Sequence, residues 1–282
     1  MKRTTTMLLA LLLLIAGFSA RSEALSIPID GVPVDIDLDG DGAEETVACV
    51  MLLDDDLERL QLQVSPRGGA AVSAEMDFCV WTVGRAADLN GDGLVELLFS
   101  GDVMSDDYYT WCYNYVNGRL KPVLFADVNR DENGAGYFKQ GYGQLIALDP
   151  AAGTVTLSGS QDVLGTWFGS RTLKLSEDGL FECADDGLWR RYVDPADTAV
   201  WEYGALTLKV SLPCRVAGAE TTLSPGDKIL ITGSDKLSRA TFVTPDGQTG
   251  EISISQDYQR GWGWTVEGVS EAEAFEFVPY AD

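Results

Sequence analysis

Apolar and polar residues alternate in short runs along most of this chain, and few stretches show the spacing of an amphipathic helix. β-branched and aromatic residues fill these runs, as expected of strands with one buried face. Asn117-Gly118 and Asp178-Gly179 are pairs that favour two-residue hairpin turns. We therefore expect an all-β fold of antiparallel sheets. The predicted strands cover 45–53, 57–65, 94–101, 109–116, 153–159, 171–176, 205–212, 227–233, 239–245 and 250–255.

The character of the chain changes near residue 200. Acidic loops and aromatic strands precede it, whereas several short strands with tight turns follow it. The latter pattern is typical of a small barrel. We expect a signal peptide over 1–24, a propeller-like β-repeat domain over 25–200 and a small β-barrel over 201–282, with one continuous repeat fold as the alternative.

The N-terminal segment predicts export. Lys2 and Arg3 precede an apolar run, and Ser22 and Ala24 supply the small residues of a cleavage site. The apolar run is shorter than a comfortable membrane span, and no other stretch approaches that length. We expect a secreted or extracellular-surface protein without a membrane span.

The net charge of the chain limits the classes of partner that it can bind. The formal net charge is −24, and because residues 1–24 contribute three basic residues and one acidic residue, the remainder carries −26. Such a chain repels nucleic acid and anionic membranes and attracts cations. It contains no histidine, which excludes Ser-His-Asp and Cys-His catalysis and the commonest zinc ligand.

The cysteines form no CxxC pair, so the sequence does not predict a zinc or redox motif. Two disulfides could form after export, but small buried residues in strands are an equally good interpretation. The five are Cys49, Cys79, Cys112, Cys183 and Cys214.

An acidic nonapeptide occurs twice, as DLDGDGAEE over 37–45 and DLNGDGLVE over 88–96. Oxygen-bearing side chains at positions 1, 3 and 5 can converge on one point, and glycine at position 6 allows the bend that turns the position-7 carbonyl inward. Such oxygen ligands suit Ca²⁺ better than Mg²⁺. The predicted ligands are Asp37, Asp39, Asp41, Ala43 and Glu45 in the first copy and Asp88, Asn90, Asp92, Leu94 and Glu96 in the second.

The loops are not EF-hands, because position 12 is Ala48 or Phe99 instead of glutamate, and strand-like residues flank both. An acidic loop that leads directly into a strand resembles the FG-GAP/VCBS repeat family over about residues 30–135. The resemblance implies extracellular β-propeller blades in which calcium stabilises the fold. A third, decayed copy contains Asp127, Asn129 and Asp131, and we do not expect it to hold a metal.

The C-terminal segment resembles bacterial Src-homology-like (SH3-like) barrels of exported proteins. LSPGDKILITG and TFVTPDGQTGEISI, within 223–254, carry this resemblance. It implies contact with peptidoglycan or another cell-wall component, and the alternative is a structural barrel without a ligand.

Aromatic residues gather in YYTWCYNY over 108–115 and at Trp262 and Trp264. Exposed rings could stack on sugars, but a strand with packed rings on both faces is the simpler interpretation. The carboxylate pairs Asp106-Asp107 and Asp185-Asp186 could serve a glycosidase.

These features predict an exported, non-enzymatic binding or adhesion module with two structural calcium ions and no catalytic residues. Its partner would be a protein, a glycan or a cell-wall component. The alternative is a carbohydrate-binding protein or a cryptic glycoside hydrolase.

Overall fold

The computed structural model describes residues 23–54, 57–77, 80–103, 107–126, 137–256 and 263–281. The fold of this part is all-β, with three sheets and two short helices, α2 (Thr198–Gly204) and α3 (Glu271–Ala274). Within it, no helix combines the length and the apolar character that crossing a bilayer requires. The predicted signal peptide lies almost entirely outside the described residues.

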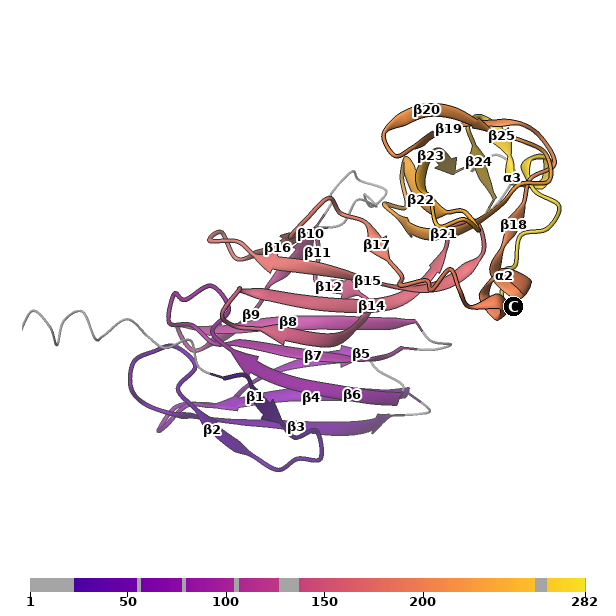
Figure 1. The fold of residues 1–282 in the computed structure, drawn as a ribbon. Helices are drawn as coiled ribbons and strands as arrows, with labels where there is room; N and C mark the ends of the chain where they lie inside the picture. Colours follow the sequence, from indigo (N-terminus) through magenta and orange to yellow (C-terminus); the bar gives the residue numbers. More distant parts are fainter. Residues whose placement is uncertain are drawn as a thin grey trace, which may run out of the picture.

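The first two sheets are antiparallel and stack on each other at the N-terminal end of the molecule (Figure 1). The first sheet has the order β2 (Val34–Ile36), β3 (Glu45–Asp54), β4 (Leu57–Ser65) and β5 (Val72–Asp77). The second has the order β1 (Leu25–Ile27), β6 (Val80–Ala87), β7 (Glu96–Asp102), β8 (Tyr108–Val116) and β12 (Gln140–Tyr142), and β9 (Arg119–Pro122) also pairs with β8.

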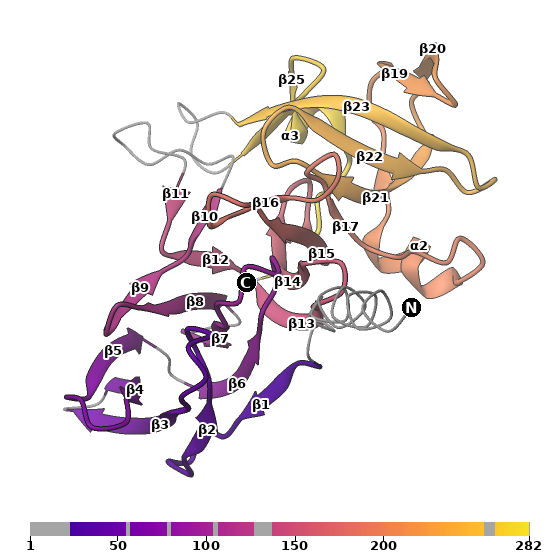
Figure 2. The same cartoon turned by 90° about the vertical axis from the view of Figure 1, so that its left-hand side faces the viewer.

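The third sheet continues into the C-terminal part of the chain, where it curls strongly (Figures 1 and 2). Its path is β11 (Tyr137–Phe138), β10 (Leu124–Ala126), β16 (Leu180–Cys183), β15 (Thr166–Leu175), β17 (Trp189–Arg190), β21 (Lys228–Ser234), β22 (Arg239–Val243), β23 (Thr249–Gln256), β19 (Leu212–Val216) and β20 (Ala219–Leu223). Beside this path lie β13 (Gln144–Asp149), β14 (Thr154–Asp162), β18 (Leu206–Thr207), β24 (Trp264–Val266) and β25 (Val269–Ser270).

Strand β7 explains how the sheets are held together. Leu97 and Phe99 pack into a core shared with the first sheet, whereas Leu98 packs into a second core that extends to the C-terminal strands. Both faces of β7 are therefore buried. Burial of apolar area on both sides is the main stabilising contribution of such a central strand.

The second core and the third sheet both contain residues from before and after residue 200. Strand β17 pairs with β21 through Trp189 opposite Ser234, and the core joins Phe181 to Phe275 through contiguous buried residues. The expected boundary near residue 200 stays a prediction.

The expected strand over 205–212 is wrong in its extent, because β18 ends at Thr207 and β19 begins at Leu212. Between them Leu208 accepts a hydrogen bond from Gly226 N–H and forms a bridge with Phe275. Leu208 and Leu212 are both buried, and Leu212 pairs with Leu223 on β20.

The four described cysteines form no disulfide, and three of them are buried. The environment of the three buried cysteines matches the interpretation as small core residues. Cys79 lies outside the described residues.

Candidate cation site in two acidic loops

Each acidic nonapeptide forms a loop between two strands of one sheet. The first acidic loop (37–45) connects β2 to β3, and the second acidic loop (88–96) connects β6 to β7. The second residue of each loop, Leu38 or Leu89, is fully buried and anchors the loop to a core. The polar residues on either side of the leucine therefore project from a fixed base.

In the first acidic loop, Asp37 organises the main chain. Its carboxylate accepts hydrogen bonds from Gly40 N–H at 2.9 Å and Gly42 N–H at 3.0 Å, and Asp41 accepts one from Ala43 N–H at 2.7 Å. The φ angles of Gly40 and Gly42 are +72° and +86°, which L-residues with a side chain rarely adopt. Glycine is thus required at both positions for this tight turn.

The second acidic loop repeats this arrangement. Asp88 accepts from Gly91 N–H at 2.7 Å and from Gly93 N–H at 3.1 Å, and Asp92 accepts from Leu94 N–H at 2.8 Å. Gly91 and Gly93 have φ angles of +78° and +87°. The two nonapeptides therefore share one backbone conformation as well as a sequence pattern.

The final glutamate of each loop is also the first residue of the following strand, and its carboxylate closes the loop. Glu45 accepts from Leu38 N–H at 2.9 Å, and Glu96 accepts from Leu89 N–H at 2.7 Å. Both are buried, at 4% and 0% exposure. A buried carboxylate needs hydrogen bonds or an opposite charge, because it has lost its hydration.

The environment of the two glutamates disfavours their charged forms. Burial raises the pKa of Glu96 to about 7, although the Leu89 N–H and the Asn114 amide stabilise the carboxylate. Burial also raises the pKa of Glu45, and the nearby charges of Asp39, Asp41 and Asp37 add to this effect. A bound cation would oppose both shifts, because its positive charge favours the ionised carboxylates.

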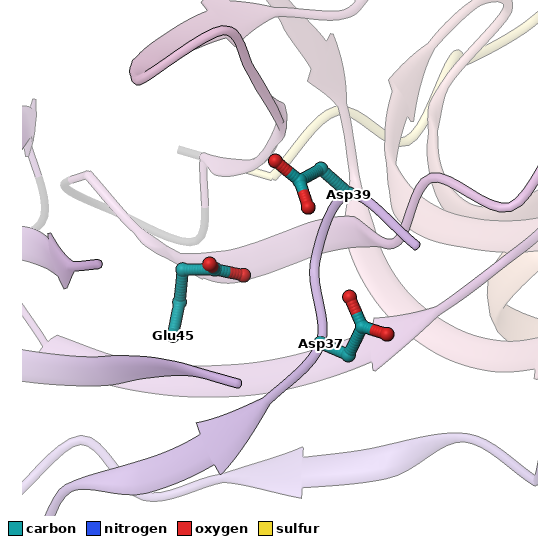
Figure 3. Close-up of side chains that lie close together, drawn as sticks. All are labelled: Asp37, Asp39 and Glu45. Carbon is teal, nitrogen blue, oxygen red and sulfur yellow. The ribbon is translucent and has the colours of Figure 1, made fainter. Parts of the chain in front are cut away.

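The first acidic loop brings together three predicted ligands. One carboxylate oxygen from each of Asp37, Asp39 and Glu45 lies within 4.8 Å of the others. Figure 3 shows the Glu45 carboxylate facing the segment that carries the two aspartates. The Asp39 Oδ1 atom is buried without a hydrogen-bond partner in the structure. A buried carboxylate oxygen without a hydrogen-bond donor is free to bind a cation.

In the second acidic loop, more of the side-chain oxygens accept hydrogen bonds from other groups of the protein. The Asn90 side-chain amide donates to Asp92 Oδ2 at 2.9 Å, and the Asn114 amide donates to Glu96 Oε1 at 3.0 Å. Asn114 lies on β8, opposite Glu96 in the register with β7. Sequence reasoning missed this residue, because nothing in the nonapeptide indicates which residue the neighbouring strand places beside its glutamate.

The donor atoms fit calcium. All the side chains predicted to bind are carboxylates or an amide, which are the hard oxygen ligands that Ca²⁺ takes in flexible geometry. The structure uses the N–H groups of Ala43 and Leu94 within the loops. Coordination by the carbonyls of these two residues stays a prediction.

The two loops contact each other directly. Val95 N–H donates to the Leu38 carbonyl at 2.9 Å. A Cβ atom added to Gly40 would lie 2.9 Å from the Gly93 carbonyl oxygen. The candidate sites therefore share main-chain contacts. The third copy, with Asp127, Asn129 and Asp131, lies outside the described residues.

The aromatic residues of 108–115 do not form an exposed platform. Trp111, Tyr113 and Tyr115 are buried, and Tyr109 packs against the same core between the first two sheets. The expected packing of these rings is confirmed, but their placement on both faces is wrong, because alternate residues of a strand share a face. Trp264 is also buried, and Trp262 lies outside the described residues.

The carboxylates of the two proposed pairs lie in different environments. Asp186 contacts two guanidinium groups, Arg190 at 2.7 Å and Arg239 at 3.2 Å, while Asp185 accepts from Gly187 N–H. Asp107 is exposed, and Asp106 lies outside the described residues.

Comparisons with protein-family models, with curated proteins and with solved structures give no match to this chain. The acidic loops, through their geometry and their sequence pattern, are therefore the feature of the chain that points to a function.

Proposed function

We propose that the chain is an exported, non-enzymatic binding module that is stabilised by two calcium ions, one in each acidic loop. The observation that carries this proposal is the buried, unpartnered Asp39 Oδ1 atom, which lies in one cluster with oxygens of Asp37 and Glu45. The equivalent backbone of the second acidic loop extends the proposal to that loop.

The role of the ions would be structural. Each loop joins two strands of one sheet and is anchored by a buried leucine, so an ion there would hold strand ends together. Its charge would also offset the repulsion among the carboxylates of the loop. The ions would thus stabilise the folded state without taking part in a reaction.

The family proposal is that residues 30–135 are repeats of the FG-GAP/VCBS type, in a propeller-like arrangement. It is supported by the equivalent loops between β2 and β3 and between β6 and β7, and by the stacking of their sheets. The proposal for 201–282 is a small SH3-like barrel that contacts a protein, a glycan or a cell-wall component. It is supported by the short, strongly curled strands β18 to β25.

Thermal unfolding tests the calcium proposal. Protein in chelator is compared with protein in about 1 mM Ca²⁺, a concentration suited to extracellular sites. Calcium should raise the melting temperature because it binds the folded state, and the double variant Asp41→Ala, Asp92→Ala should lose this rise. The matched control, Asp30→Asn, removes a nearby exposed carboxylate. This variant should keep the rise in melting temperature with calcium. Identical melting curves with and without calcium would refute the proposal.

A further inference from the structure

A groove of about 550 Å³ lies on the curled part of the third sheet, beside the point where β17 joins β21. A cross-strand row runs along it through Arg190, Gly233, Thr241, Glu251 and Arg215, on five adjacent strands. The groove is within the size range of small-molecule sites. It lies in a part of the molecule distinct from the acidic loops.

The charge of the groove is opposite to that of the chain. Arg190, Arg191 and Arg215 line it together with only two acids, Asp186 and Glu251, whereas the whole chain has 44 acidic and 20 basic residues. In addition, Arg239 contacts both lining acids, at 3.2 and 3.6 Å. The groove is therefore a cationic site on a strongly acidic protein, which favours an anionic ligand.

Two of the arginines are held in place by carboxylates. Arg190 Nη2 contacts Asp186 at 2.7 Å, and Arg215 Nη2 contacts Glu220 at 3.2 Å. Each of these ion pairs uses one nitrogen of a guanidinium group that has five N–H donors. The ion pairs therefore leave donors for a ligand.

Arg191 has no carboxylate partner among the described residues. Its Nε donates to the Ile231 carbonyl, and its guanidinium lies 5.6 Å from the centre of the Trp167 ring. Burial lowers its pKa to about 10, because a charge removed from water has lost hydration that nothing of opposite sign replaces. An anion in the groove would supply the missing charge.

Hydroxyl groups complete the groove. Thr232, Thr241 and Thr249 all line it, and the Oγ1 atoms of Thr232 and Thr241 lie 3.0 Å apart. A threonine hydroxyl both donates and accepts hydrogen bonds. Such groups match the hydroxyls of a sugar better than an apolar ligand.

We propose that this groove binds a small acidic saccharide, with its carboxylate or phosphate held by Arg191 and Arg215 and its hydroxyls contacting the threonines. This gives the proposed binding module a class of ligand. The groove does not use the acidic loops, so the inference does not depend on calcium.

The test is an NMR titration of the full chain in calcium-containing buffer with glucuronate, glucose 6-phosphate and glucose. The first two probes distinguish a carboxylate from a phosphate, and glucose lacks the anion. We expect saturable amide shifts around 215–218 and 249–251 with at least one acidic sugar, a Kd of about 1 mM, and no saturation with glucose. Arg215→Gln and Arg191→Gln should each weaken binding about tenfold through loss of a charge-assisted hydrogen bond.

The control variant is Arg119→Gln, which removes the same charge from an exposed position on β9 and should bind like the wild type. Because Arg191 is partly buried, Arg215→Gln decides the result if Arg191→Gln does not fold. No saturable shift with either acidic sugar, or equal binding by Arg215→Gln and wild type, would overturn the inference. A calcium-dependent melting shift that persists in that case leaves the cation proposal standing.

Discussion

Val95 N–H donates a hydrogen bond to the carbonyl of Leu38 at 2.9 Å, which joins the second acidic loop to the first. The loops are also in contact where Gly40 faces the Gly93 carbonyl. Two candidate ion sites that share main-chain contacts have the means to influence each other, since ordering one loop fixes part of the other.

Gly40→Ala tests this contact. The new Cβ would lie 2.9 Å from the Gly93 carbonyl oxygen, so we expect a loss of stability of about 2 kcal/mol and weaker calcium binding at both loops. Chemical denaturation and calcium titration measure these effects.

Gly179→Ala is the matched control for this change, because Gly179 also has a φ of +72° but no atom within 4 Å of an added Cβ. It carries the same backbone strain without the contact. If the two alanine variants lose the same stability, the contact between the loops contributes nothing measurable.

The two loops should differ in their dependence on calcium. The first has Asp39 where the second has Asn90, and the Asn90 amide donates to Asp92. Asn90→Asp replaces this donor by a charge, so in chelator it should destabilise the fold by about 1 kcal/mol and in calcium it should tighten binding.

Asp39→Asn is the reciprocal change and should do the opposite at the first loop: higher stability in chelator and weaker calcium binding. Chemical unfolding of both variants, each in chelator and in calcium, gives the four free energies of unfolding that this comparison needs. Shifts of the same sign for both variants in chelator would contradict the argument.

Hydrogen bonds join β24 and the C-terminal segment to the ends of β14 and β15. Trp264 donates its indole N–H to the Asp162 carbonyl at 2.8 Å, and Thr166 N–H donates to the Pro279 carbonyl at 2.9 Å. Trp264→Phe should therefore lower the free energy of unfolding by about 2 kcal/mol while the chain still unfolds in one transition.

Trp201→Phe is the control, because Trp201 also donates its indole N–H to a carbonyl, that of Pro195 at 2.9 Å, but is less buried. The free energy of unfolding should fall clearly less in Trp201→Phe than in Trp264→Phe. Two separate transitions in the Trp264 variant would indicate instead that residues 201–282 fold as an independent unit.

A pH dependence is expected from Asp235. Burial acts to raise its pKa, but hydrogen bonds from the N–H groups of Ser238, Arg239 and Leu237 outweigh burial and hold the pKa below its usual value. A lowered pKa in the folded state gives stability that is present above pH 4 and is lost as the pH falls through the folded-state pKa.

Asp235→Asn should therefore cost about 1 kcal/mol at neutral pH, and this difference should shrink below about pH 4. Asp149→Asn, where one main-chain N–H contacts the carboxylate, should cost less. A difference between wild type and Asp235→Asn that does not change with pH would show that the carboxylate charge is not the cause. Urea unfolding across the pH range measures both variants.

Alternation and turn chemistry were enough to predict an all-β fold, because a half-buried strand must alternate and a tight hairpin needs glycine at positive φ. The nonapeptides likewise predicted two equivalent loops, since Asp37 and Asp88 bond to glycine N–H groups within their own segments. These are local interactions, so they are encoded in contiguous residues.

The sequence by itself determined the strand-rich character, the conformation of the acidic loops and the excess of negative charge. Only the tertiary structure decided that Leu38 meets Val95, that Asn114 lies beside Glu96, and that Arg190, Arg191 and Arg215 line one groove. Each of these arrangements brings together residues from different segments of the chain. Their proximity is set by strand pairing and sheet curvature, which depend on how the buried side chains of the whole chain pack together.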